Sequence, residues 1–114
     1  MAALLLSTLV LVAGGSSGLF FVYTPHTTTA LTINEGADPD VRRDILSHLR
    51  ALVPENSSFL HAEGNSDAHV KASLFGSSVQ VMVEEGRLLF GIWQWVFLCE
   101  FDGPRKRKIW MRSY

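Results

Sequence analysis

The most regular pattern of apolar and polar positions lies in ADPDVRRDILSHLRALVPE, residues 37–55. Its apolar side chains recur at helical spacing, at Val41, Ile45, Leu49 and Leu52. Asp38 is suited to cap a helix whose first residue is Pro39, because its carboxylate accepts a backbone N–H and a proline there leaves no donor unpaired. The pattern predicts a helix that begins after Asp38 and ends before Pro54.

Shorter apolar runs predict β-strands. GLFFVYT is rich in aromatic residues and follows a turn, which predicts a buried strand from Leu19 to Thr24, ended by Pro25. SSVQVMV alternates, so its valines at 79, 81 and 83 share one face. RKRKIWMRS predicts a last, partly exposed strand. Helix and strands together predict an α+β fold.

The segment LLFGIWQWVFLCEFDG, which follows the turn EEGR, predicts a long strand with a break at Gly91. Side chains alternate between the two faces of a strand. One face would carry Trp93, Trp95, Phe97, Cys99 and Phe101, and the other would carry Gln94, Glu100 and Asp102. The first face suits a core or an interface, and the second can reach a polar site.

The N-terminal segment MAALLLSTLVLVAGGSSG is apolar from Ala2 to Ala13. It lacks the basic start of a signal peptide and is shorter than the roughly 20 residues that span a bilayer. We expect a buried helix that ends at Gly14 and Gly15, where glycine supplies a cap and a turn. A targeting peptide is the alternative.

Composition limits the class of protein. A chain of 114 residues fits one domain, and a chain this short has apolar surface left to seal a subunit interface. The net charge of −1 argues against a nucleic-acid binder. Charge is nevertheless uneven, because no lysine or arginine precedes Arg42 and PRKRKIWMR holds five of the ten. The single cysteine, Cys99, excludes an intrachain disulfide and suits the cytoplasm.

Three histidines, His26, His61 and His69, are candidate metal ligands. Two of them lie in HAEGNSDAHVKAS, a segment rich in polar side chains. Three imidazoles that converge leave a coordination position open on a catalytic metal. Separate hydrogen-bonded or surface histidines are the alternative, since the spacing does not show convergence. A fourth histidine, His48, is expected to face solvent.

Three long blocks carry a resemblance: HTTTALTINEGADPDVRRDILSHL, HAEGNSDAHVKASLFGSS and EEGRLLFGIWQWVFLCEFDGPRKRK. They resemble the YjbQ family, known as the secondary thiamine-phosphate synthase family, including its GxWQ and EFDGPR motifs. The similarity runs from residue 19 to about residue 107, whereas residues 1–18 differ and the family's usual N-terminal segment is absent. The resemblance implies one α+β domain over 1–114, with a mixed or antiparallel sheet packed against two or three helices, and a homotrimer.

The resemblance also assigns site residues. It places His26, His61 and His69 at a site for a divalent metal, zinc or similar, near the subunit boundary, with His69 also catalytic. Glu35 would supply a carboxylate that orients a histidine or moves a proton. Thr27 and Thr28 would add hydroxyls beside the site, and turn or capping chemistry explains them equally well.

Further residues are candidates for substrate binding. Lys71 and Ser73 are assigned to phosphate oxygens, with a solvated lysine as the alternative. Asn65 and Asp67 support the site or shape the loop. Arg105 binds a phosphate or, as we favour, forms an ion pair with Asp102 or Glu100. Trp93 and Gln94 line a pocket for a flat heterocycle, although a strand tryptophan often lies in a core. These additional candidates are Asn65, Lys71, Ser73, Trp93, Gln94 and Arg105.

The function that the resemblance implies is a weak or secondary thiamine-phosphate synthase activity. The enzyme would join hydroxymethylpyrimidine diphosphate to thiazole phosphate and release pyrophosphate. The alternative is a non-catalytic trimeric protein that binds a metal or a small ligand. The expected partner is a small phosphorylated metabolite, and no organic cofactor, nucleic acid or membrane is expected.

Overall fold

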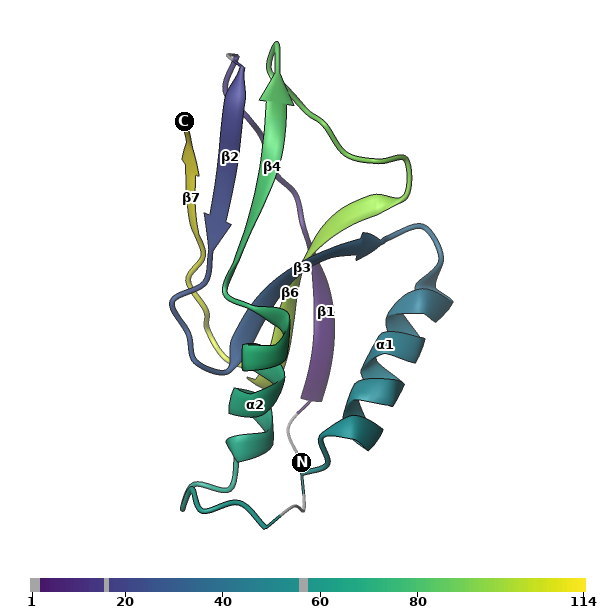
Figure 1. Ribbon diagram of the computed structural model, residues 1–114, viewed down its shortest axis with the longest axis vertical. Helices are drawn as coiled ribbons and strands as arrows, with labels where there is room; N and C mark the ends of the chain where they lie inside the picture. The colour runs from purple at the N-terminus through teal and green to yellow at the C-terminus, as the bar shows by residue number, and fades with distance from the viewer. Residues whose placement is uncertain (1–2, 16, 56–57) are drawn as a thin grey trace.

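The computed structural model describes residues 3–15, 17–55 and 58–114. Within these residues the chain forms seven strands and two helices: β1 (Ala3–Leu9), β2 (Gly18–Tyr23), β3 (Thr29–Glu35), α1 (Pro39–Leu52), α2 (Ser66–Phe75), β4 (Ser78–Glu84), β5 (Arg87–Leu88), β6 (Gln94–Gly103) and β7 (Trp110–Ser113). The strands make two antiparallel sheets, one in the order β1-β6-β3 and one in the order β5-β4-β2-β7 (Figure 1). The predicted α+β class is confirmed.

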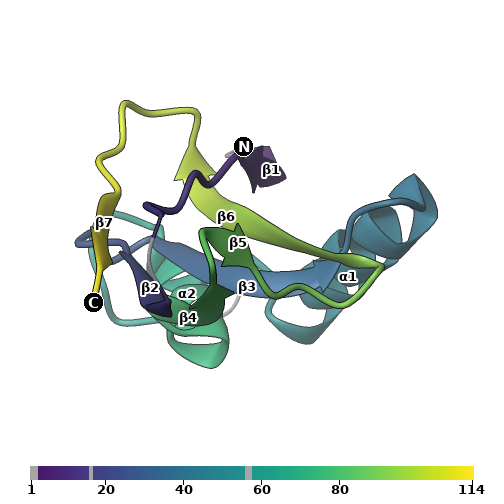
Figure 2. The same ribbon diagram turned by 90° about the horizontal axis from the view of Figure 1, so that it is seen from above.

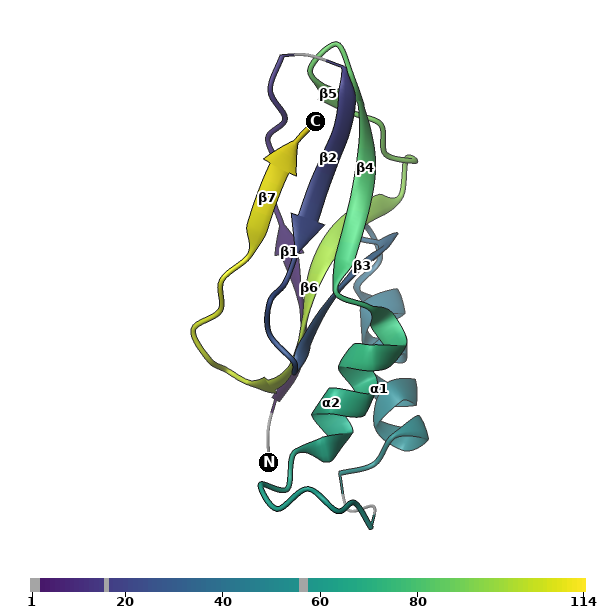
Figure 3. The same cartoon turned by 60° about the vertical axis from the view of Figure 1, so that its left-hand side comes forward.

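Each face of the three-stranded sheet contributes side chains to an apolar cluster. On one face Phe97, Cys99 and Phe101 of β6 pack with residues of both helices, such as Leu49 and Ala72. On the other face Leu31 and Leu98 belong to a second apolar cluster with β2 and β4. Figure 3 shows β7, β2 and β4 side by side. Seen from above, α1 and β7 lie at opposite sides of the molecule (Figure 2).

Helix α1 follows the sequence prediction. The Asp38 carboxylate accepts a hydrogen bond from the backbone N–H of Asp40 at 2.9 Å, and Pro39 is the first helical residue. Leu49 is buried, whereas His48 is exposed as expected. The predicted strands at β2, β4 and β7 are also present.

The N-terminal apolar run is a strand, so the predicted helix is wrong. In β1, Leu4 and Leu6 are buried while Leu5 and Ser7 are exposed, which is the alternation of a strand. β1 pairs with β6, with Leu6 opposite Cys99. A helix here would leave one edge of β6 without hydrogen-bond partners. No helix in the described ranges is long and apolar enough to cross a membrane.

The segment that leads into β6 also differs from the prediction. The break covers several residues around Gly91, because β5 ends at Leu88 and β6 begins at Gln94. Trp93 therefore precedes the strand and is exposed, as is Trp95. Only the inner part of the predicted aromatic face belongs to the core. β3 is a strand that the sequence pattern did not single out.

Gly36, which follows β3, accommodates the Trp95 ring. Its N–H donates to the carbonyl of Trp93 at 3.0 Å, and a Cβ at this position would overlap the Cγ and Cδ2 atoms of Trp95. We expect Gly36→Ala to lower the free energy of unfolding by about 1–3 kcal/mol, as overpacking does. Urea unfolding measures the change, with Gly14→Ala as control, because no atom lies within 4 Å of a Cβ there. Equal midpoints for the two variants would contradict this packing.

Candidate functional site

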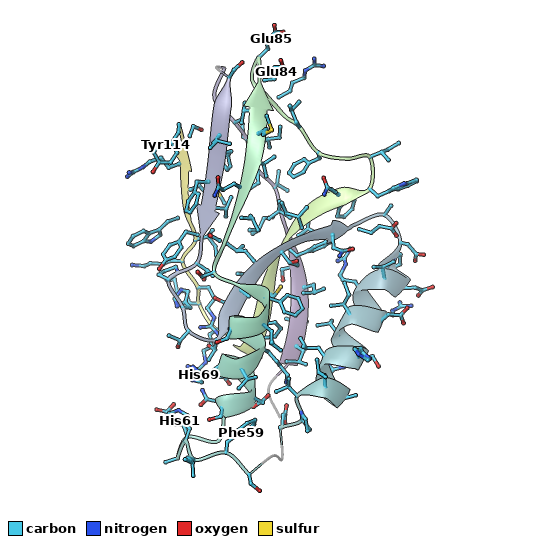
Figure 4. All side chains as sticks on the ribbon, viewed as in Figure 1. Phe59, His61, His69, Glu84, Glu85 and Tyr114 are labelled. Carbon is cyan, nitrogen blue, oxygen red and sulfur yellow. The ribbon has the colours of Figure 1, made fainter. Side chains whose placement is uncertain are left out.

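The histidines that the sequence singled out line one cavity of about 390 Å³. His26 comes from the loop before β3, His61 from the loop before α2, and His69 from α2 itself. Figure 4 shows His61 and His69 close together at the lower left of the molecule. The same cavity is lined by four other predicted site residues, Thr27, Thr28, Asn65 and Arg105. Residues far apart in the sequence thus meet at one end of the three-stranded sheet.

The histidines have different partners. The rings of His61 and His69 meet edge to face, with centroids 5.4 Å apart. Nε2 of His61 lies 3.9 Å from a carboxylate oxygen of Glu63. Nε2 of His26 accepts a hydrogen bond from the backbone N–H of Lys108 at 2.8 Å. His26 therefore holds the basic loop, residues 104–109, which joins β6 to β7. The lone pair of its Nε2 atom is already used in this hydrogen bond.

The three histidines of one chain do not form the predicted metal centre as they stand. In the ranges that the structure describes, no three His, Cys, Asp or Glu side chains come together as ligands for a metal ion. His26 would have to release Lys108 before its Nε2 reached an ion. Cys99 offers no substitute, because burial raises the pKa of its thiol to about 12 and keeps it protonated. A bound divalent ion stays a prediction.

A buried ion pair borders the cavity. Nε of Arg107 donates to Oε1 of Glu100 at 2.7 Å, and its Nη2 donates to Oε2 of the same carboxylate. The same Nη2 lies 2.9 Å from the hydroxyl oxygen of Thr28, which accepts from it. The pair ties β6, the basic loop and the loop before β3 together. Sequence reasoning missed Arg107, because nothing in the run RKRK distinguishes one basic residue from the next.

A second network holds the start of α2. Asp102 accepts a hydrogen bond from Nδ2 of Asn65 at 2.7 Å and another from Nη2 of Arg105 at 3.0 Å. The favoured ion pair between Arg105 and Asp102 is thus present. Arg105 remains more than half exposed, so its other N–H groups can reach a ligand.

Lys71 lies outside the cavity, and its predicted role in phosphate binding is corrected. Its side chain is fully buried, and Nζ donates to a carboxylate oxygen of Asp67 at 2.7 Å. Since both groups face the core of the molecule, neither the phosphate role nor a solvated lysine fits. Ser73 donates to the carbonyl of His69 at 2.9 Å and lines a neighbouring hollow that His26 and His69 share.

Glu35, Trp93 and Gln94 lie at the opposite end of the sheet from the histidines. Glu35 pairs with Gln94, whereas Thr29, next to the cavity, pairs with Glu100. β3 is seven residues long, so its ends are roughly 20 Å apart at about 3.3 Å per residue. One chain therefore does not bring these three predicted residues to the histidine cavity.

Known proteins are similar to this chain in both sequence and fold. The sequence model of the family described as UPF0047 protein YjbQ-like matches residues 6–114. The chain belongs to this family. Among YjbQ-like relatives, UPF0047 protein MJ1081 of Methanocaldococcus jannaschii is 50% identical over 95 residues, which are 83% of this chain and 69% of the relative. UPF0047 protein YugU of Bacillus subtilis is 48% identical over 100 residues, 87% of this chain and 76% of the relative.

Two solved YjbQ-like structures resemble this fold. An uncharacterized conserved protein of the family from Clostridium acetobutylicum superimposes with a TM-score of 0.85 at 52% identity, covering 87% of this chain and 77% of its own. The conserved hypothetical protein TT1486 from Thermus thermophilus gives 0.85 at 40% identity, covering 98% of this chain and 99% of its own. The family match begins at residue 6, ahead of the boundary at residue 19 that the resemblance alone set.

Proposed function

We propose that the histidine cavity binds the phosphate or diphosphate group of a small metabolite and supports a thiamine-phosphate synthase reaction. The observation that carries the proposal is the convergence of three imidazoles and the partly free Arg105 guanidinium on one cavity of about 390 Å³. That volume is within the range of small-molecule sites, roughly 300–1,000 Å³. Imidazolium and guanidinium groups are donors that match phosphate oxygens.

The reaction requires a diphosphate to leave. The thiazole nitrogen attacks the methylene carbon of hydroxymethylpyrimidine diphosphate, and a C–N bond forms as the C–O bond to the diphosphate breaks. The electron pair of that bond leaves with pyrophosphate, whose negative charge must be neutralised. Arg105 and a protonated His69 would donate to those oxygens. Arg107, which is bonded to Glu100 and Thr28, would hold the lining of the cavity in place.

His69→Ala is expected to weaken pyrophosphate binding about tenfold or more, because a charge-assisted hydrogen bond contributes about 1.5–3 kcal/mol. Formation of thiamine phosphate from the two precursors should fall by about 10²–10⁴, the usual contribution of a positioned acid. Calorimetry measures the binding, and product analysis measures the turnover. His48→Ala is the control, because His48 lies on α1 outside this cavity.

Two outcomes separate the readings of this site. Turnover by the wild type that is unchanged in His69→Ala would rule out the assigned role. Pyrophosphate binding without turnover would favour the alternative, a non-catalytic protein that binds a phosphorylated ligand. Zinc titration and elemental analysis of the same samples test whether a divalent ion binds.

A further inference from the structure

The end of the three-stranded sheet opposite the cavity exposes an apolar surface. Ile92 is 85% exposed and Trp93 57% exposed, and Trp95 beside them is also exposed. All three lie next to Glu35 and Gln94, where β3 ends and β6 begins. Large exposed tryptophans are unusual on a monomer surface and common in interfaces. This surface, residues 92–95 with Glu35, is named the aromatic end. Its exposed apolar side chains are typical of a surface that another protein chain covers.

The two ends of the sheet have opposite charge. Residues 35–44, which follow β3 and open α1, carry four carboxylates and two arginines, a net charge of −2. Residues 100–108, which border the cavity, carry four basic and two acidic side chains, a net charge of +2. Contact between the aromatic end of one chain and the cavity of another would join unlike charges.

We propose that a second copy of this chain covers the histidine cavity with its aromatic end, so that the complete site lies between two copies. The partner copy would contribute Trp93 as a flat wall for a heterocycle, Gln94 as a hydrogen-bonding amide and Glu35 as a carboxylate. These are the three predicted site residues that one chain holds roughly 20 Å away, at the far end of β3. The inference rests on the proposed function for the ligand, and on charge and exposure for the contact.

Such a contact joins two different surfaces, the cavity of one copy and the aromatic end of another. Each copy has both surfaces and can therefore make two such contacts. Repetition of a head-to-tail contact closes into a ring or grows into a filament. The homotrimer that the family resemblance implies is one such ring. Each trimer would then hold three equivalent sites, each built from two copies.

Chemical cross-linking tests this contact without any ligand. One tagged chain carries Ile92→Cys and a differently tagged chain carries Glu63→Cys, since both side chains are strongly exposed and Glu63 lines the cavity. The natural Cys99 does not interfere, because it is buried and its pKa is raised to about 12. After the two chains are produced together, a short bis-maleimide should yield a product that carries both tags.

The matched control replaces Ile92→Cys with Met82→Cys, an exposed position on β4 in the other sheet. Cross-linking at least several-fold above this control supports the shared site. Equal cross-linking, or a monomer by light scattering, overturns it. Pyrophosphate titration of the wild type separates the two proposals. A cross-link without pyrophosphate binding would support the contact between copies and contradict the proposed function. Pyrophosphate binding without a cross-link would support the proposed function and contradict the contact.

Discussion

Replacing Lys71 with methionine is expected to lower the free energy of unfolding by roughly 3–5 kcal/mol, the cost of leaving one partner of a buried ion pair alone. Lys71 is fully buried, and its ammonium group lies 2.7 Å from the carboxylate of Asp67, which is buried as well. In the variant, the Asp67 charge would have no countercharge and no access to water. Urea unfolding followed by circular dichroism measures the loss.

The double variant Lys71→Met/Asp67→Leu should recover most of this stability, because apolar side chains of similar volume can replace a buried pair at little cost. Arg43→Met is the matched control. Arg43 and Asp40 form an ion pair of 2.9 Å on α1, but both side chains are exposed, so little or no change is expected. A loss in Lys71→Met as small as that in Arg43→Met would contradict the buried pair.

Glu100→Gln is expected to destabilise the fold by a similar amount, roughly 3–5 kcal/mol, because it leaves the Arg107 charge buried without a countercharge. Both side chains are less than one tenth exposed. The change should also loosen the cavity, since Arg107 connects β6 to Thr28. Unfolding midpoints and pyrophosphate affinity should therefore fall together.

Arg105→Met serves as the comparison for that variant. Arg105 also pairs with a carboxylate at the end of β6, but its side chain is 58% exposed. Solvent screens such a pair, so stability should change little while pyrophosphate binding weakens. If both variants lost the same stability, burial would not be what distinguishes the two arginines.

The parts of the fold that local chemistry determines were predictable. Helix α1 combines a capping aspartate, a proline at its first position and apolar residues at helical spacing, and each of these acts within a few residues. β1 has no such signal, because Leu5 is apolar although it points outward and so hides the alternation. Its conformation comes from pairing with β6, and a distant partner cannot be read from a short window.

The residues of the candidate site were predictable in part, and their burial was not predictable. The histidines, the threonines, Asn65 and Arg105 do meet at one cavity. The spacing of Asp67 and Lys71, four residues apart on a helix, allows an ion pair, but it does not tell whether that pair faces water or core. The burial of Lys71 depends on how α2 packs, and the burial of Arg107 depends on its contacts with Glu100 and Thr28, which are distant in sequence.

The pairing of β1 with β6 has a consequence for biosynthesis. Ala3 lies opposite Gly103 and Leu9 opposite Val96, so β1 leaves the ribosome long before its partner strand β6. Contacts so distant in sequence form slowly, because a long loop must close first. Until residues 94–103 emerge, the leucine-rich strand is an open, apolar edge that can pair with other chains. The exposure of β1 in the nascent chain therefore lasts until β6 has been synthesised.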